Sequence, residues 1–109
     1  MKNEAFLVQE IYDAYREFRN PEGIKLAELF LKKNKKNQLV WKILGELYKR
    51  GNDIPRAILA YRRAIYLIPA DANALINLGL LFDSNNQKID AEKNYRQALV
   101  LDPYSTLAM

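Results

Sequence analysis

The chain repeats one pattern of residues at an interval of 34 positions. The segment from Trp41 to Pro69 aligns without gaps with the segment from Leu75 to Pro103, and ten of 29 positions are identical, where background residue frequencies would give about two. The identical pairs are Leu44/Leu78, Gly45/Gly79, Leu47/Leu81, Asn52/Asn86, Ala57/Ala91, Tyr61/Tyr95, Arg62/Arg96, Ala64/Ala98, Leu67/Leu101 and Pro69/Pro103. A unit of this length cannot bury its apolar face alone and must stack on a neighbouring copy. The period therefore predicts a solenoid.

Each repeated unit has the apolar spacing of two helices. Apolar residues recur every three or four positions, and nowhere do four or more residues alternate as in a half-buried strand. The predicted fold class is all-α, a superhelix of three helical hairpins. The six helices are expected at about Glu4 to Phe18, Pro21 to Lys33, Gln38 to Arg50, Asp53 to just before Pro69, Ala72 to Ser84, and from the turn SNNQK to Asp102.

Capping residues mark the expected helix ends. Asn3, Asp53 and Asp71 are favoured N-cap types, and Asn20 is expected to cap the second helix with Pro21 at its first position. Gly51 is expected to take the left-handed conformation that follows the end of the third helix.

Composition limits the chemistry that the chain can perform. The 109 residues are 50% apolar and 28% charged, which is typical of one folded domain. Neither cysteine nor histidine occurs, so disulfides, thiolate ligands and the commonest general base and metal ligand are all excluded. We find no paired carboxylates, phosphate-binding loop or activated nucleophile, and we therefore expect no enzyme, cofactor or metal site.

Charge and hydropathy bear on location and partners. The net charge of +4 is too modest to argue for nucleic acid, and the basic run from Lys32 to Lys36 is interpreted as a solvated helix end without interleaved aromatic residues. The first twenty residues show no signal peptide. Since no apolar run is long enough to span a bilayer, we expect a cytoplasmic protein that binds neither membranes nor nucleic acid.

The signature positions of the two repeats resemble the tetratricopeptide repeat family. The first copy has Trp41, Leu44, Gly45, Tyr48, Ala57, Tyr61, Ala64 and Pro69, and the second has Leu75, Leu78, Gly79, Phe82, Ala91, Tyr95, Ala98 and Pro103. Small residues at these places allow helices to cross closely, and the aromatic residues fill the spaces between them. The resemblance implies a right-handed array that serves as a protein-interaction module.

The first hairpin is interpreted as a degenerate repeat. One period before the first copy, Leu7 falls at the place of Trp41 and Pro21 at that of Pro55, but Glu10-Ile11 replaces the Leu-Gly pair and Lys35 stands in place of the proline. The expected organisation is a single domain over 1–109 with repeats at about 4–37, 38–71 and 72–105. Residues 106–109 would begin a further repeat or form a tail.

The resemblance also implies a binding surface for a peptide segment of a partner protein. In this family the first helix of each pair lines a concave groove, and the corresponding side chains here are Lys42, Glu46, Lys49, Asn73, Ile76, Asn77 and Leu80. Alternatively, Lys42 and Glu46, four positions apart, pair with each other, and Ile76 and Leu80 pack on the third helix. Lys42 and Asn77 match two positions of the family's carboxylate clamp, but Glu46 would repel a carboxylate, so we disfavour that site.

A second hypothesis concerns the last helix. A solenoid normally ends in a polar capping helix, whereas Tyr95, Leu99 and Leu101 give this one an apolar side. We therefore consider self-association into a homo-oligomer, or packing on another domain, through these residues. The module could also belong to an enzyme and recruit its substrate.

Overall fold

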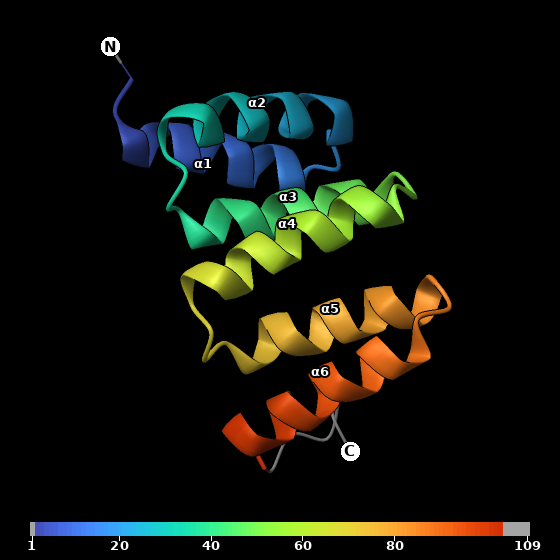
Figure 1. The fold of residues 1–109 in the computed structure, drawn as a ribbon. Helices are drawn as coiled ribbons and strands as arrows, with labels where there is room; N and C mark the ends of the chain where they lie inside the picture. The colour runs from blue at the N-terminus through green and yellow to red at the C-terminus, as the bar shows by residue number, and fades with distance from the viewer. Residues whose placement is uncertain (1, 104–109) are drawn as a thin grey trace.

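The computed structural model describes residues 2–103, so the sequence prediction for 106–109 lies outside the described residues. Six helices form within that range (Figure 1), and no strand occurs there. The helices are α1 (Glu4–Arg16), α2 (Asn20–Lys33), α3 (Gln38–Arg50), α4 (Ile54–Leu67), α5 (Ala72–Ser84) and α6 (Lys88–Leu101). The all-α prediction is confirmed.

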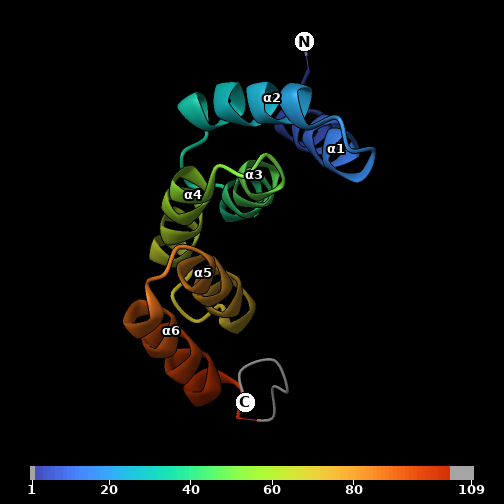
Figure 2. The same cartoon turned by 90° about the vertical axis from the view of Figure 1, so that its right-hand side faces the viewer.

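The helices stack in chain order. Each packs on the next, from α1 on α2 to α5 on α6. Figure 2 shows a curved stack whose inner side carries α1, α3 and α5, with α2, α4 and α6 outside. The regular succession of hairpins confirms the predicted superhelix. None of the helices in 2–103 is long and apolar enough to cross a membrane.

The turns inside the three hairpins follow the 34-residue period. The residues in the left-handed conformation are Phe18, Asn52 and Asn86, with φ of 57°, 60° and 59°. At the middle turn the N–H of Asp53 donates to the carbonyl of Tyr48 at 2.9 Å and that of Asn52 to Lys49 at 2.9 Å, which is the Schellman pattern. The prediction for Gly51 is wrong, since its φ is −82°: Gly51 is the C-cap of α3, and the next residue, Asn52, takes the left-handed conformation.

N-caps show a second periodic set of residues. The side chains of Asn3, Asn37 and Asp71 each accept a hydrogen bond from the backbone N–H three residues later, at 2.8, 3.1 and 3.0 Å. Asp53 also caps its helix as predicted. Asn20 does not cap α2, because the helix already begins at Asn20 and Arg19 holds the N-cap position without a side-chain bond. Because Phe18 makes the left-handed turn, the N-cap position falls on Arg19, which lies 34 residues before the N-cap Asp53.

Large and small core residues exchange places between the hairpins. In the second and third hairpins a glycine on the first helix faces a tyrosine ring on the second helix, in the pairs Gly45/Tyr61 and Gly79/Tyr95. In the first hairpin the equivalent positions hold Ile11 and Ala27, both buried. In the first hairpin the larger side chain is therefore on the first helix, whereas in the other two it is on the second helix. This exchange explains how a repeat without the Leu-Gly signature still joins the common core.

Candidate peptide-binding face

The predicted groove residues belong to α3 and α5, two of the helices on the inner side of the stack (Figure 2). Lys49, Asn73 and Leu80 are exposed, and Lys42, Glu46 and Asn77 are half-buried. Six of the seven predicted side chains therefore reach the surface, three of them exposed and three half-buried.

Lys42 is held by an interhelical ion pair. Its Nζ lies 3.0 Å from Oδ2 of Asp71, the cap of α5, and Nε2 of Gln38 donates to the same oxygen at 2.7 Å. Burial alone would raise the pKa of Asp71, but hydrogen bonds from the Ala74 N–H, Lys42 and Gln38 outweigh that effect and lower the pKa. Lys42 thus ties α3 to the turn before α5.

Glu46 has a partner inside its own hairpin. The hydroxyl of Tyr61, on α4, donates to Oε1 of Glu46 at 2.6 Å. Burial and this bond together raise the pKa of Tyr61, so the phenol stays protonated as a donor. The alternative that Lys42 pairs with Glu46 is wrong, since each side chain is bonded to a different element.

The predicted residues of α5 fall into two groups. Ile76 is only 5% exposed and belongs to a core cluster with Leu75 and Ala98, so it presents almost no surface to a ligand. Asn77 donates to the side-chain oxygen of Asn73 at 3.3 Å. Leu80 is 46% exposed and forms an apolar point beside this amide pair.

The inner face extends onto α1, beyond the groove residues predicted from the sequence. A cleft of about 710 Å³ lies between α1 and α3 and is lined by Glu4, Ala5, Val8, Gln9, Tyr12, Asn37 and Leu39. Tyr12 and Leu39 are 41% and 50% exposed. The 34-residue period could have predicted this extension, because Tyr12 lies 34 residues before Glu46 and Ala5 lies 34 residues before Leu39.

Arg50 holds α1 against α3 at the other end of this face. Its guanidinium lies 4.1 Å from the ring centre of Tyr15 and 4.4 Å from that of Phe18, and it donates to the carbonyl of Tyr15 at 2.6 Å. The aromatic contacts and the hydrogen bond fix the angle between the two helices that form the cleft.

The residues proposed for self-association differ in exposure. Tyr95 packs on Gly79 inside the third hairpin, and Leu99 is half-buried. Leu101 is 44% exposed, and its neighbour Val100 is 81% exposed. Of the three predicted residues, only Leu101 therefore presents substantial apolar surface.

No metal centre is formed by the part of the chain from 2 to 103, where no cluster of three or more potential ligands of the His, Cys, Asp or Glu type occurs. The inner face offers amides, a lysine and apolar side chains, which are groups for recognition.

A family model described as the tetratricopeptide repeat matches residues 72–105. The chain belongs to the tetratricopeptide repeat family.

Comparisons with individual proteins agree with this assignment. The chain is 32% identical over 85 residues to the general transcriptional corepressor ssn6 of Schizosaccharomyces pombe, a match that covers 76% of this chain and 8% of that protein. The crystal structure of MamA matches with a TM-score of 0.89 and 24% identity, over 93% of this chain and 59% of that one. The first tetratricopeptide domain of Spaghetti (RPAP3), bound to the HSP90 peptide SRMEEVD, matches with a TM-score of 0.87 and 18% identity, over 94% and 81% of the two chains. At such identities the structural matches show the fold, and the chain spans only a small part of the corepressor.

Proposed function

We propose that this tetratricopeptide repeat chain is a protein-interaction module that holds a peptide segment of a partner protein along its inner face. One observation carries the proposal: three successive inner helices expose recognition groups on the same side, namely Tyr12 on α1, Leu39 and Lys49 on α3, and Leu80 on α5. The similarity in fold to a domain whose structure contains a bound peptide supports this use of the surface.

The chemistry of the face suggests what the segment contains. An apolar side chain would enter the cleft beside Tyr12 and Leu39, and a carboxylate would pair with Lys49. The amides of Asn73 and Asn77 would bond the backbone of an extended or helical segment. Lys42 and Glu46 serve mainly to support α3, because both are already bonded within the fold.

The test is a capture experiment with a matched pair of variants. Lys49→Glu with Leu80→Ser alters the inner face, and Lys88→Glu with Ile89→Ser makes the same chemical changes at exposed positions of α6. Proteins captured by the wild type and by the α6 variant, identified by mass spectrometry, are expected to be lost from the inner-face variant. If both variants capture the same proteins as the wild type, the inner face is not the binding surface.

A second proposal is self-association through the end of α6, where Val100 and Leu101 are exposed apolar residues. Sedimentation of the wild type over a range of concentrations should then show a dimer that Val100→Lys with Leu101→Ser converts to a monomer. A wild-type monomer at every concentration would exclude this role.

A further inference from the structure

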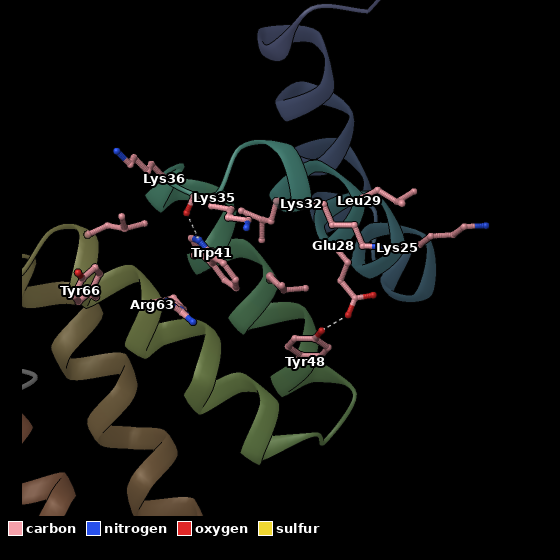
Figure 3. Close-up of a pocket in the computed structure, with 13 residues that line it drawn as sticks. Lys25, Glu28, Leu29, Lys32, Lys35, Lys36, Trp41, Tyr48, Arg63 and Tyr66 are labelled. Atoms are coloured by element: carbon pink, nitrogen blue, oxygen red, sulfur yellow. Dashed lines mark hydrogen bonds between the residues drawn. The ribbon is translucent and has the colours of Figure 1, made fainter.

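A larger cleft, of about 890 Å³, opens on the outer side of the stack between α2 and α4 (Figure 3). Both helices pack on α3, and the outward residues Trp41, Leu44 and Tyr48 of α3 line the cleft between them. Its volume falls within the range of about 300–1,000 Å³ that is usual for ligand sites.

The cleft carries strong positive charge. Five cations line it, namely Lys25, Lys32, Lys35, Lys36 and Arg63. The single carboxylate in the lining, Glu28, accepts a hydrogen bond from the hydroxyl of Tyr48. Across residues 2–103 none of the five cations has an ion-pair or side-chain hydrogen-bond partner. The positive charge is therefore available to an anionic partner.

Apolar and aromatic groups stand among these charges. The indole Nε1–H of Trp41 donates to the backbone carbonyl of Lys35 at 2.8 Å, so the polar edge of the ring is satisfied and the ring is held in place (Figure 3). Leu29 on α2 and Tyr66 on α4 are 52% and 78% exposed. Exposed apolar side chains gathered around a concave site are typical of surfaces that bind a partner.

The repeat itself does not require this combination of residues. One period later, Lys35 and Lys36 correspond to Pro69 and Ala70, Trp41 to Leu75, and Arg63 to Gln97. The same stacking geometry between α4, α5 and α6 is thus built without the cations or the indole. The cations and the indole of the outer cleft are therefore specific to the place where α2, α3 and α4 meet, and the fold does not require them.

A neighbouring hollow lengthens the site. It has a volume of about 470 Å³, shares Trp41, Leu44, Tyr48, Arg63 and Tyr66 with the main cleft, and continues along α4 to Leu59, Arg62 and Arg56. Arg56 also pairs with Asp53 at 3.6 Å. An elongated site with cations along its length suits a polypeptide segment better than a compact small molecule.

We propose that the outer cleft binds an acidic segment of a partner protein, with an apolar side chain seated between Leu29, Trp41 and Tyr66 and carboxylates paired with Lys36 and Arg63. Single-stranded nucleic acid is the competing polyanion, but it stacks bases on a series of exposed aromatic rings. Here only Tyr66 is mostly exposed, and the rest of the floor includes the aliphatic side chains of Leu31, Leu44 and Leu67. This site lies on the opposite face from the one in the proposed function and does not depend on it.

The test selects ligands from random sequences, so the natural partner need not be identified first. A library of displayed peptides about 12 residues long, which reach about 40 Å when extended, is first passed over the variant Lys36→Glu with Arg63→Glu to remove peptides that bind elsewhere. The remaining peptides are then selected on the wild type. We expect the enriched peptides to have net negative charge and at least one large apolar residue. Because Trp41 is the only tryptophan, its fluorescence should change when a synthetic copy binds.

Matched variants and probes separate the alternatives. Lys36→Glu with Arg63→Glu should weaken binding about tenfold or more, as expected for loss and reversal of close charge pairs. Lys88→Glu with Lys93→Glu, which changes the net charge equally on α6, and Lys49→Glu on the inner face should leave it within about twofold. The proposal is overturned if no acidic peptide is enriched, if the α6 variant weakens binding equally, or if an oligothymidylate or oligouridylate binds more tightly than the peptide.

Discussion

The ring of Tyr61 lies on the backbone of Gly45 so closely that a Cβ atom at position 45 would stand 2.6 Å from two ring carbons. Tyr61 is 1% exposed, and its hydroxyl is bonded to Glu46 in the next position along α3. The ring is thus fixed at both ends, and the glycine is required by the close approach of the two helices.

Gly45→Ala should therefore destabilise the protein even though alanine favours helix. Overpacking against a ring that cannot move costs about 1–3 kcal/mol, which exceeds the propensity gain of up to about 1 kcal/mol. Urea denaturation measures the free energy of unfolding. Gly51→Ala is the control, because the nearest atom to its added Cβ is a carbonyl oxygen at 3.5 Å. Equal stability of Gly45→Ala and the wild type would contradict the packing argument.

Asn52 should tolerate glycine and not alanine. Its φ of 60° lies in the left-handed region, where a residue with an ordinary Cβ is disfavoured by about 1–2 kcal/mol. Asn52→Ala is expected to lower the free energy of unfolding by about 1 kcal/mol, whereas Asn52→Gly changes it by less than about 0.5 kcal/mol. Thermal and urea denaturation of the two variants give the comparison, and the prediction fails if alanine is tolerated as well as glycine.

Asp71 should make stability depend on acid pH. Its folded-state pKa is lowered, so the unfolded chain binds its proton more readily. The stabilisation is present above the ordinary pKa of about 4 and is lost as the pH falls through the folded-state value. At neutral pH, Asp71→Ala should cost about 1–2 kcal/mol, since it also removes the cap of α5.

Denaturation at several pH values tests the role of Asp71. Between neutral pH and about pH 3, which lies below the ordinary aspartate pKa, Asp71→Asn should lose less stability than the wild type. Asp102→Asn, at an exposed site beyond α6, should follow the wild-type curve. Parallel curves for the wild type and Asp71→Asn would show that this carboxylate is not linked to folding.

Tyr48 should link stability to alkaline pH with the opposite sign. Burial and the hydrogen bond to Glu28 raise its pKa to about 12, above the ordinary value of about 10. The folded state keeps a proton that the unfolded chain loses, so this stabilisation is present below about pH 10 and disappears towards about pH 12. Tyr48→Phe should cost about 0.5–1.5 kcal/mol at neutral pH and should flatten the alkaline loss. Tyr66→Phe, at a site 78% exposed, should do neither.

Much of the fold could be predicted because its determinants are local and periodic. The spacing of apolar residues decides that α1 to α6 are helices, and the period that relates Gly45 to Gly79 and Tyr61 to Tyr95 decides that they stack. Asp53 and Asp71 act within one turn of their own position, so their capping roles follow from residue type alone. The errors at Asn20 and Gly51 are shifts of one residue, because the position in the hairpin, and not the residue's own tolerance, decides which residue turns: glycine tolerates the left-handed conformation best, yet Phe18 and Asn52 adopt it.

The partners of the surface side chains were decided only by the tertiary structure. Lys42 pairs with Asp71 across 29 positions, Glu46 accepts from Tyr61 across 15, and the turn after α2 brings Lys36 to the same cleft as Arg63 of α4. In each case the two groups lie on different elements, and the angle at which the helices pack determines the distance between them. The amino-acid order by itself determined that this protein is a curved stack of helix pairs. Which charges are paired inside the stack, and which are left for a partner, depends on long-range packing that no local pattern contains.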